Sequence, residues 1–209
     1  MFRPNTHYSF GVEATDTCYS ATGAVTLTTV YNERELPIEV VFCDVTGRRL
    51  SGVEFRYDTS GNLIEEAQTT AAGALPEEIM TSLNKAQLET FRALCSTTIM
   101  HRYNEQGRRV ETRSRLGPVG RSIKTMTYNE HGDQIGEFNE HQGRDYNLDE
   151  EGLISDSPTQ EIATRSEARF HYDYDTRGNW VMKTVRSRGR TGDDFTVSTV
   201  ERRTIGYFD

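Results

Sequence analysis

An eight-residue turn motif recurs along this chain, and it constrains the fold more than any other feature of the sequence. Its first position is Tyr, its second is Asp or Asn, its fifth is Gly and its eighth is apolar. The four complete copies span residues 57–64, 103–110, 128–135 and 174–181. Two weaker copies, 43–50 and 148–154, keep the turn residues and lose the Tyr. These copies indicate that the 209-residue chain is a repeat array.

Each copy predicts a β-hairpin. Asp or Asn at position 2 opens a type I turn by accepting a hydrogen bond from the backbone two residues on. Gly at position 5 takes the left-handed conformation that closes such a turn with a bulge. The residues to which this structural role is assigned are Tyr57, Asp58, Gly61, Tyr103, Asn104, Gly107, Tyr128, Asn129, Gly132, Tyr174, Asp175, Gly178 and Trp180.

The flanks of the turns alternate as strands do. Phe170, Tyr172 and Tyr174 are expected on one face of a strand, and beyond the turn Trp180 and Met182 are expected to share a face. Successive hairpins are therefore predicted to lie side by side in an antiparallel meander.

The complete copies resemble the YD repeats of the RHS family, whose signature is Tyr-Asp-x-x-Gly followed by Arg or Asn and an apolar residue. The segments YDTSGNLIEE, YNEQGRRVET and YDTRGNWVMK carry the resemblance, which covers roughly residues 42–185. It implies long β-hairpin ribbons, which in family members spiral into hollow shells of bacterial toxins and teneurin-type surface proteins. It also implies a secreted or cell-surface setting and an association with carbohydrate.

The chain departs from this family in two respects. It is too short to close a shell, and it lacks the RHS core motif with its Asp-Pro-x-Gly ending. Cleavage and release of a C-terminal toxin are therefore not carried over, and we expect no toxin domain after Asp209.

We predict an all-β, mainly antiparallel fold in which residues 1–209 form a single array of YD-type hairpins. One helical insertion is expected at about residues 75–95, because apolar residues are spaced helically there and Asn84 with Gln87 forms a capping pair. The helix is expected to cover the open sheet or one of its edges. Residues 155–164 are predicted to form a loop, and residues 195–208 a further strand pair.

Composition narrows the function classes. A net charge of −8 and a pI near 5.2 argue against nucleic-acid binding, which needs a basic footprint. No run of 18 apolar residues exists, so no membrane span is expected, and the chain as given begins without a signal peptide. Cys18, Cys43 and Cys95 form no C-x-x-C pair, and a disulfide framework is not expected.

Catalytic motifs are missing from the sequence. It contains no nucleophile elbow, Gly-rich phosphate loop or zinc motif, and its five His residues are scattered. Calcium held by the Asp-x-x-Gly turns is an alternative, but those Asp side chains are already needed within the turns. We expect no enzyme activity, no cofactor and no metal.

Two basic stripes leave alternatives open. One stripe consists of Arg186, Arg188 and Arg190, and the other of Arg109, Arg113 and Arg115. Their guanidinium groups could grip the carboxylates of an acidic glycan or of a protein partner. We favour ion pairs with Glu on neighbouring strands. The Tyr row could stack on sugar rings, but we favour packing against the neighbouring hairpin, in which the ring contributes more than the hydroxyl.

The sequence thus predicts a non-catalytic hairpin-repeat scaffold or binding module, secreted or in the cell envelope, with a glycan or a protein as its partner. The alternative is a fragment of an RHS toxin-delivery shell. Stacked repeats bury apolar surface only between neighbours, and neither end of the chain shows a capping element. We therefore expect at least one open sheet edge, and either a longer native protein or weak self-association.

Overall fold

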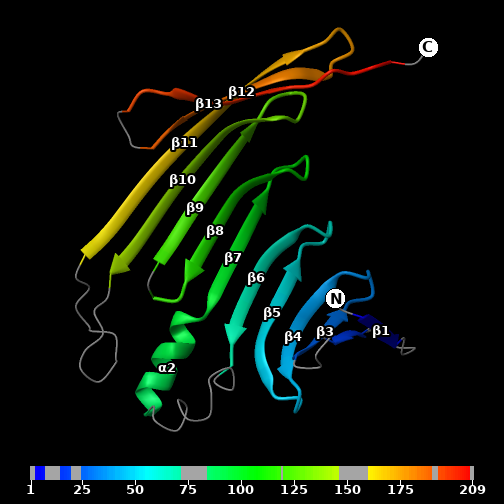
Figure 1. The fold of residues 1–209 in the computed structure, drawn as a ribbon, viewed down its shortest axis with the longest axis vertical. Helices are drawn as coiled ribbons and strands as arrows, with labels where there is room; N and C mark the ends of the chain where they lie inside the picture. Colours follow the sequence, from blue (N-terminus) through cyan, green and yellow to red (C-terminus); the bar gives the residue numbers. More distant parts are fainter. Residues whose placement is uncertain are drawn as a thin grey trace.

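Strands that follow one another along the chain lie side by side in the computed structural model (Figure 1). The elements are β1 (Arg3–His7), β2 (Thr15–Tyr19), β3 (Val25–Tyr31), β4 (Pro37–Asp44), β5 (Arg49–Tyr57), β6 (Leu63–Thr70), α2 (Lys85–Leu94), β7 (Thr97–Tyr103), β8 (Arg109–Leu116), β9 (Gly120–Tyr128), β10 (Gln134–Asp145), β11 (Gln160–Tyr174), β12 (Trp180–Arg188) and β13 (Thr196–Arg202). The structure describes residues 3–7, 15–19, 25–71, 84–118, 120–145, 160–189 and 193–207.

All the strands that the structure describes belong to one 13-stranded sheet, whose order from β1 to β13 is the order of the chain. Every pairing is antiparallel, so the sheet is a meander with β1 and β13 at its two edges. The predicted all-β, antiparallel hairpin fold with one short helix is confirmed.

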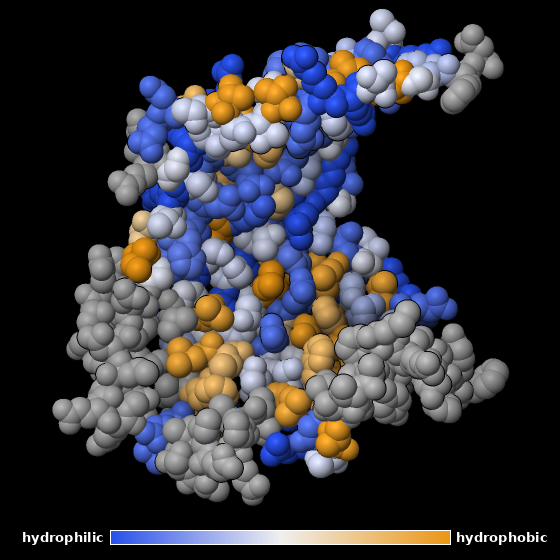
Figure 2. All heavy atoms as spheres, in the orientation of Figure 1, coloured by the Kyte–Doolittle hydropathy of each residue, from blue (hydrophilic) through white to orange (hydrophobic). Residues whose placement is uncertain are grey.

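The sheet has almost no interior. Taken as whole residues, only Met126, at 6% exposure, Thr29, at 8%, and Gly52 are buried in the part of the chain that the structure describes. The chain exposes 14519 Å² of surface, whereas a compact protein of 23.8 kDa exposes about 9,900 Å². Figure 2 shows apolar residues in the open among polar ones. The apolar contacts that stabilise the sheet are therefore made between neighbouring strands, as in other repeat proteins.

The two faces of the sheet differ in character. On β5, Val53 and Phe55 are half-buried whereas Glu54 and Arg56 are exposed. Strand pairing places Phe55, Ile99 and Met126 on the same face of the sheet. Tyr172 lies on this face too, and we name it the tyrosine face. The opposite face carries Arg56, Arg113, Arg169 and Arg186, and we name it the arginine face.

Six described hairpin turns share one set of backbone hydrogen bonds. The N–H of position 2 donates to the carbonyl of position 6, and the N–H of position 5 donates to the carbonyl of position 2, at 2.9–3.1 Å. The glycines at position 5 of the predicted copies have φ between 72° and 90°, which confirms the left-handed conformation that the motif predicts. They are Gly47, Gly61, Gly107, Gly132 and Gly178. The weaker copy at residues 148–154 lies outside the described residues.

One of the six turns was missed by the sequence pattern. Residues 31–38 read YNERELPI, with Tyr31 at position 1, Asn32 at position 2 and Ile38 at position 8. Glu35 occupies position 5 with a φ of 59°, the only non-glycine at positive φ among the described residues. The fold tolerates Glu there because the remaining turn bonds are complete, including those from the Arg34 and Leu36 N–H groups to Asn32 Oδ1.

Position 8 of the motif is an unpaired bulge residue. In the last hairpin Tyr174 pairs with Trp180 and Asp173 pairs with Met182, so Val181 has no partner on β11. The same offset occurs in the other five turns, at Ile38, Leu50, Ile64, Val110 and Ile135. An extra residue on one strand reverses the alternation of side chains beyond it.

This reversal corrects two predictions of shared faces. Trp180 lies on the tyrosine face beside Tyr172, 6.1 Å between ring centroids, whereas Met182 lies on the arginine face. The bulge at Val110 likewise moves Arg109 away from the face that Arg113 and Arg115 share. A strict two-residue period cannot reveal a bulge, because the bulge adds a residue without changing the local composition.

Of the helical insertion predicted at about residues 75–95, the described part contains α2 with the expected capping box, and residues 75–83 lie outside the described residues. Asn84 Oδ1 accepts from the Gln87 N–H at 3.0 Å, and Gln87 Oε1 accepts from the Asn84 N–H at 2.8 Å. The helix lies beyond the ends of β7 and β8 rather than over a sheet face, with the carbonyl of Ala93 against Gly117 (Figure 1). Within the described residues, no helix is long and apolar enough to cross a membrane.

Two further predictions are corrected by the strand pairing. Residues 160–164, expected as part of a loop, form the start of β11 because β10 is long enough to pair with them from His141 to Asp145. The stretch that was expected to be a strand pair, residues 195–208, contains the single strand β13, and residues 203–207 carry no strand.

Replacing Glu35 by Gly should raise the free energy of unfolding by about 0.5–1 kcal/mol. Relief of a left-handed, non-glycine conformation gains about 1–2 kcal/mol, and the added backbone entropy of Gly in the unfolded chain offsets part of it. Urea denaturation measures the change. Glu33→Gly, in the same turn at a residue without positive φ, is the matched control and should destabilise; a loss of stability in both variants would contradict the turn assignment.

Candidate functional site

The motif turns gather along one end of the sheet. The turns that join β3 to β4, β5 to β6, β7 to β8, β9 to β10 and β11 to β12 all lie at this end, which we name the turn edge (Figure 1). The turn between β4 and β5 and the helix α2 lie at the opposite end. The copy at residues 43–50, which lacks the Tyr, is the described turn at that opposite end, so the motif Tyr belongs to the turn edge.

Within each turn, the side-chain oxygen at position 2 accepts hydrogen bonds from the backbone of the same turn. Asp175 Oδ1 accepts from the N–H groups of Arg177 and Asn179 at 2.9 Å each. Asn104 Oδ1 accepts from the same two positions of its turn, and Asn129 Oδ1 accepts from the Asp133 N–H. In Asp44, the hydrogen bond from the Thr46 hydroxyl is the main cause that lowers the pKa to about 2. The Asn62 side chain similarly lowers the pKa of Asp58. These carboxylates are held ionised as turn acceptors.

The motif tyrosines connect each turn to the one before it along the turn edge. The hydroxyl donates to the backbone carbonyl at position 7 of that preceding turn. The pairs are Tyr57 to Pro37 at 2.8 Å, Tyr103 to Leu63 at 2.9 Å and Tyr128 to Arg109 at 2.7 Å. In the last hairpin Tyr172, two residues before the motif Tyr174, makes the equivalent bond to Gln134, at 3.0 Å.

These carbonyls need a side-chain donor because the backbone pairing stops short of them. Neighbouring hairpins begin to pair at position 9, as at Glu65 between β6 and β7 and at Glu111 between β8 and β9. Position 7 lies beyond the last pair, where the strands separate. The hydroxyl therefore has a structural partner, and the prediction that the ring contributes more than the hydroxyl stays to be tested by substitution.

Tyr174 and Tyr207 dock on the preceding turn in a second, shared way. The Tyr174 hydroxyl donates to Asp133 Oδ2 at 2.6 Å and accepts from Asn129 Nδ2 at 2.7 Å. The Tyr207 hydroxyl donates to Asp175 Oδ2 and accepts from Asn179 Nδ2 at 2.8 Å. Both tyrosines thus bind the side chains at positions 2 and 6 of a turn. The carboxylate is at position 6 for Tyr174 and at position 2 for Tyr207, and the amide is at the other position.

These contacts change the acidity of the phenols. Burial is the main cause that raises the pKa of Tyr174, and the hydrogen bond to Asp133 adds to it. For Tyr207 the hydrogen bond to Asp175 is the main cause of the raised pKa. The same bond is the main cause that lowers the pKa of Asp175. Both phenols are therefore fixed as hydrogen-bond donors.

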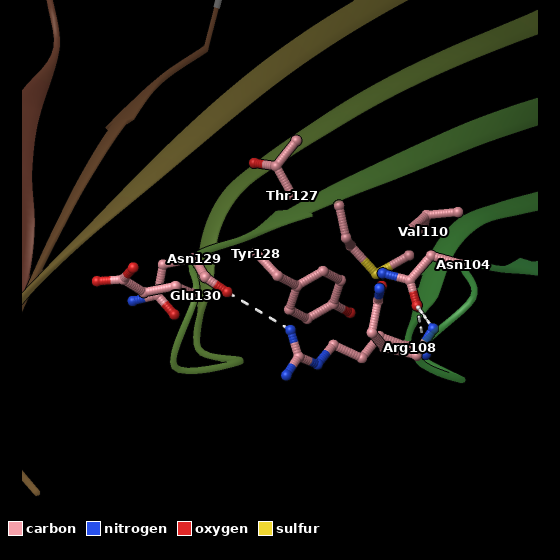
Figure 3. A pocket seen from close by; sticks show the side chains of 9 residues that line it. Asn104, Arg108, Val110, Thr127, Tyr128, Asn129 and Glu130 are labelled. Carbon is pink, nitrogen blue, oxygen red and sulfur yellow. Dashed lines mark hydrogen bonds between the residues drawn. The ribbon is translucent and has the colours of Figure 1, made fainter. Parts of the chain in front are cut away.

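Shallow grooves separate successive turns on this edge. Figure 3 shows one of about 550 Å³, where Arg108 extends from one turn toward the next. Its Nη1 donates to the Asn129 carbonyl at 3.4 Å, and its guanidinium lies 5.9 Å from the centre of the Tyr128 ring. Arg34 reaches the Thr59 carbonyl in the same way, at 3.2 Å. The grooves are lined mostly by residues that already bind one another.

The predicted basic stripe on β12 divides into residues with different roles. Arg188 binds Glu167 on β11 through two nitrogens, with Nε to Oε2 at 3.0 Å, and stacks on Phe195 at 4.6 Å. This is the cross-strand ion pair that the sequence favoured. Arg186 makes no hydrogen bond or ion pair within the part of the chain that the structure describes. Arg190 lies outside the described residues.

Arg169 joins this cluster from β11, and the sequence pattern missed it. The register places Arg169 directly opposite Arg186. Its Nε binds Glu167 Oε1 at 3.1 Å, and its guanidinium lies 4.2 Å from the centre of the Phe195 ring. The Arg188 side chain is the main cause that lowers the pKa of Glu167. Arg169 could have been found only with the pairing of β11 and β12, which the sequence does not contain.

On the second stripe, Arg113 forms an ion pair with a Glu of its own strand β8 rather than with one on a neighbouring strand. Arg113 binds Glu111 through Nε at 2.9 Å and Nη2 at 3.3 Å. Arg115 instead donates to the Gly117 carbonyl at 3.3 Å.

Other reactive side chains have structural partners. His101, 4% exposed on the tyrosine face, lies between Glu66 at 2.9 Å and Thr112 at 3.1 Å. Cys43 and Cys95 are free thiols. No three His, Cys, Asp or Glu side chains in the described ranges gather where they could hold a metal ion.

Comparisons with known proteins give little beyond this geometry. No protein-family profile matches the chain, and no curated protein does. Among solved structures, the chain is similar to one in the crystal structure of TcdB2-TccC3-Cdc42, with a TM-score of 0.40 and 12% sequence identity. The match covers 90% of this chain and 10% of that one, so this chain spans a tenth of its neighbour's length. A similarity this low carries no argument about function.

Removing the hydroxyl of Tyr103 should destabilise the protein measurably. Tyr103→Phe leaves the Leu63 carbonyl without its donor and should cost about 1 kcal/mol. Tyr103→Ala also removes the half-buried ring and should cost about 2–4 kcal/mol. Urea denaturation of the three proteins gives both differences. If Tyr103→Phe unfolds like the parent while Tyr103→Ala does not, the ring alone stabilises the turn edge.

Proposed function

We propose that this chain is a non-catalytic β-sheet scaffold, whose faces act as supporting and binding surfaces and whose edge is extended by further strands. One observation carries the proposal: the sheet exposes 14519 Å², roughly half as much again as the 9,900 Å² of a compact protein of its mass. A sheet with so little interior gains most by being lengthened or covered, because every added strand buries surface on the strand before it.

Polar side chains that bind one another within the sheet support the scaffold function. Carboxylates at position 2 accept hydrogen bonds within the turns, and motif tyrosines donate to backbone carbonyls. Three glutamates pair with basic side chains: Glu66 with His101, Glu111 with Arg113 and Glu167 with Arg188. A glycosidase needs two carboxylates facing each other across a cleft, and the grooves between turns are shallow and lined by groups that bind one another. The tyrosines are likewise engaged by the neighbouring turn, which favours structure over sugar stacking.

The setting and partner of the scaffold follow from the repeat motif. Its resemblance to YD repeats supports a secreted or cell-envelope protein and a glycan or protein partner. The second candidate, a segment of a larger toxin-delivery shell, is favoured by the same excess of surface. The reading frame that encodes the chain distinguishes the two: an RHS core and a variable C-terminal domain downstream would support the shell.

Edge-to-edge extension makes a prediction about self-association. All seven residues of β13 are exposed, with Val197 at 56% and Val200 at 49%, and no strand lies on its outer side in the described sheet. Sedimentation velocity over a tenfold concentration range should show weak self-association above the 23.8 kDa monomer.

Lysine on the edge should suppress that association. Val197→Lys with Val200→Lys places two charges on β13, whereas Glu89→Lys on the exposed side of α2 adds the same charge away from the edge as the control. Equal association in the edge variant and in the parent would contradict extension through β13. A parent that stays monomeric throughout would contradict it as well.

A further inference from the structure

A groove on the arginine face brings together two arginines from neighbouring strands. It has a volume of about 470 Å³ and is lined by Ile135, Arg169, Phe170, His171, Thr184 and Arg186. We name it the arginine groove. It lies over β11 and β12, away from the turn edge.

Two guanidinium groups meet in this groove without enough acid to balance them. Arg169 and Arg186 are direct cross-strand partners, and like charges in that position repel. The nearby carboxylate, Glu167, already binds Arg188 through two nitrogens and Arg169 through Nε. Within the described residues Arg186 makes no hydrogen bond or ion pair, and the one ion-pair contact of His171 there is with Asp173, at 3.4 Å. A carboxylate between Arg186 and Arg169 would remove the repulsion and accept from both groups.

Exposed apolar side chains border this cationic centre on both sides. Ile135, 39% exposed, lies toward β10. On β13 the register puts Val197 opposite Arg186 and Val200 opposite Thr184, and these valines are 56% and 49% exposed. From β10 to β13 the surface is therefore apolar at Ile135, cationic at the two arginines and apolar again at the valines.

This order matches the dimensions of an extended peptide. The step from β10 to β13 is three strand spacings, or about 14 Å. In an extended segment, side chains at i−2, i and i+2 point the same way and span about 13 Å. An acidic residue at i would meet the two arginines while apolar residues at i−2 and i+2 meet Ile135 and the valines.

We propose that the arginine groove binds an extended segment of a partner protein with the pattern apolar-x-acidic-x-apolar. The apolar borders favour such a segment over an acidic sugar, because a sugar is polar along its length. The aromatic rings near the groove already have cationic partners, Phe195 with Arg169 and Arg188 and Phe170 with Lys183. The proposal goes beyond the scaffold function, since it assigns a ligand to one part of one face.

Fluorescence anisotropy with a labelled Val-Ser-Glu-Ser-Val peptide tests the proposal on the full chain. Saturable binding is expected, weakened about tenfold by Arg186→Gln, which removes a charge-assisted contact. The peptide Val-Ser-Gln-Ser-Val should lose a similar factor. Arg115→Gln is the matched control, because Arg115 is exposed on the same face and also opposes an arginine, Arg121, yet lies outside the groove. It should bind like the parent.

A second variant tests occupancy of the groove with both arginines retained. Thr184→Glu places a carboxylate beside Arg186 and should abolish peptide binding, while circular dichroism confirms that each variant is folded. Three results would overturn the proposal: no saturable binding by the parent up to millimolar peptide, equal weakening by Arg186→Gln and Arg115→Gln, or binding of a sulfated oligosaccharide with none of the peptide.

Discussion

A sheet without a hydrophobic interior depends on satisfying its backbone at the places where strands separate. In this chain those places are the carbonyls at position 7 of the motif turns, beyond the last pair between hairpins. A tyrosine of the next hairpin donates its hydroxyl to four of these carbonyls, and the Arg203 side chain donates to that of Trp180 in the last turn. An unpaired carbonyl costs free energy comparable to a lost hydrogen bond. The repeated Tyr therefore continues, at the turn end of the strands, the backbone pairing that joins neighbouring hairpins into one sheet.

The location of the tyrosines shows why the repeat has two forms. Turns on the turn edge carry the Tyr, whereas the turn at residues 43–50, at the other end of the sheet, keeps only the Asp and Gly. That other end also carries α2.

The hairpins could be predicted from the sequence because turn chemistry is local. Asp58 and Gly61 determine their turn with bonds that span four residues, and Asn84 determines the start of α2 in the same way. The turn at residues 31–38 was missed because Glu35 stands where Gly is expected, although Tyr31 and Asn32 fit the motif. The side of the sheet on which Trp180 lies could not be predicted, since the bulge at Val181 has no sequence signature beyond being apolar.

The partners of the arginines on β12 could not be predicted without the strand register. Arg186 and Arg188 were visible as a stripe, but nothing in the sequence says that Arg188 faces Glu167 while Arg186 faces Arg169. Strand register decides between a satisfied ion pair and an unsatisfied one. A shift of one residue would exchange the faces, so the arginine groove exists only in the register that the turns impose.

Native-state hydrogen exchange on a turn variant tests the central claim that stability is local to neighbouring hairpins. Gly107, at a φ of 72°, has open space around it, so Gly107→Val strains only the turn. The account predicts lost protection in β7 and β8 and in their neighbours β6 and β9, with β3, β4, β11 and β12 protected as in the parent. Equal loss of protection throughout the sheet would contradict it, because a common core would then unite the strands.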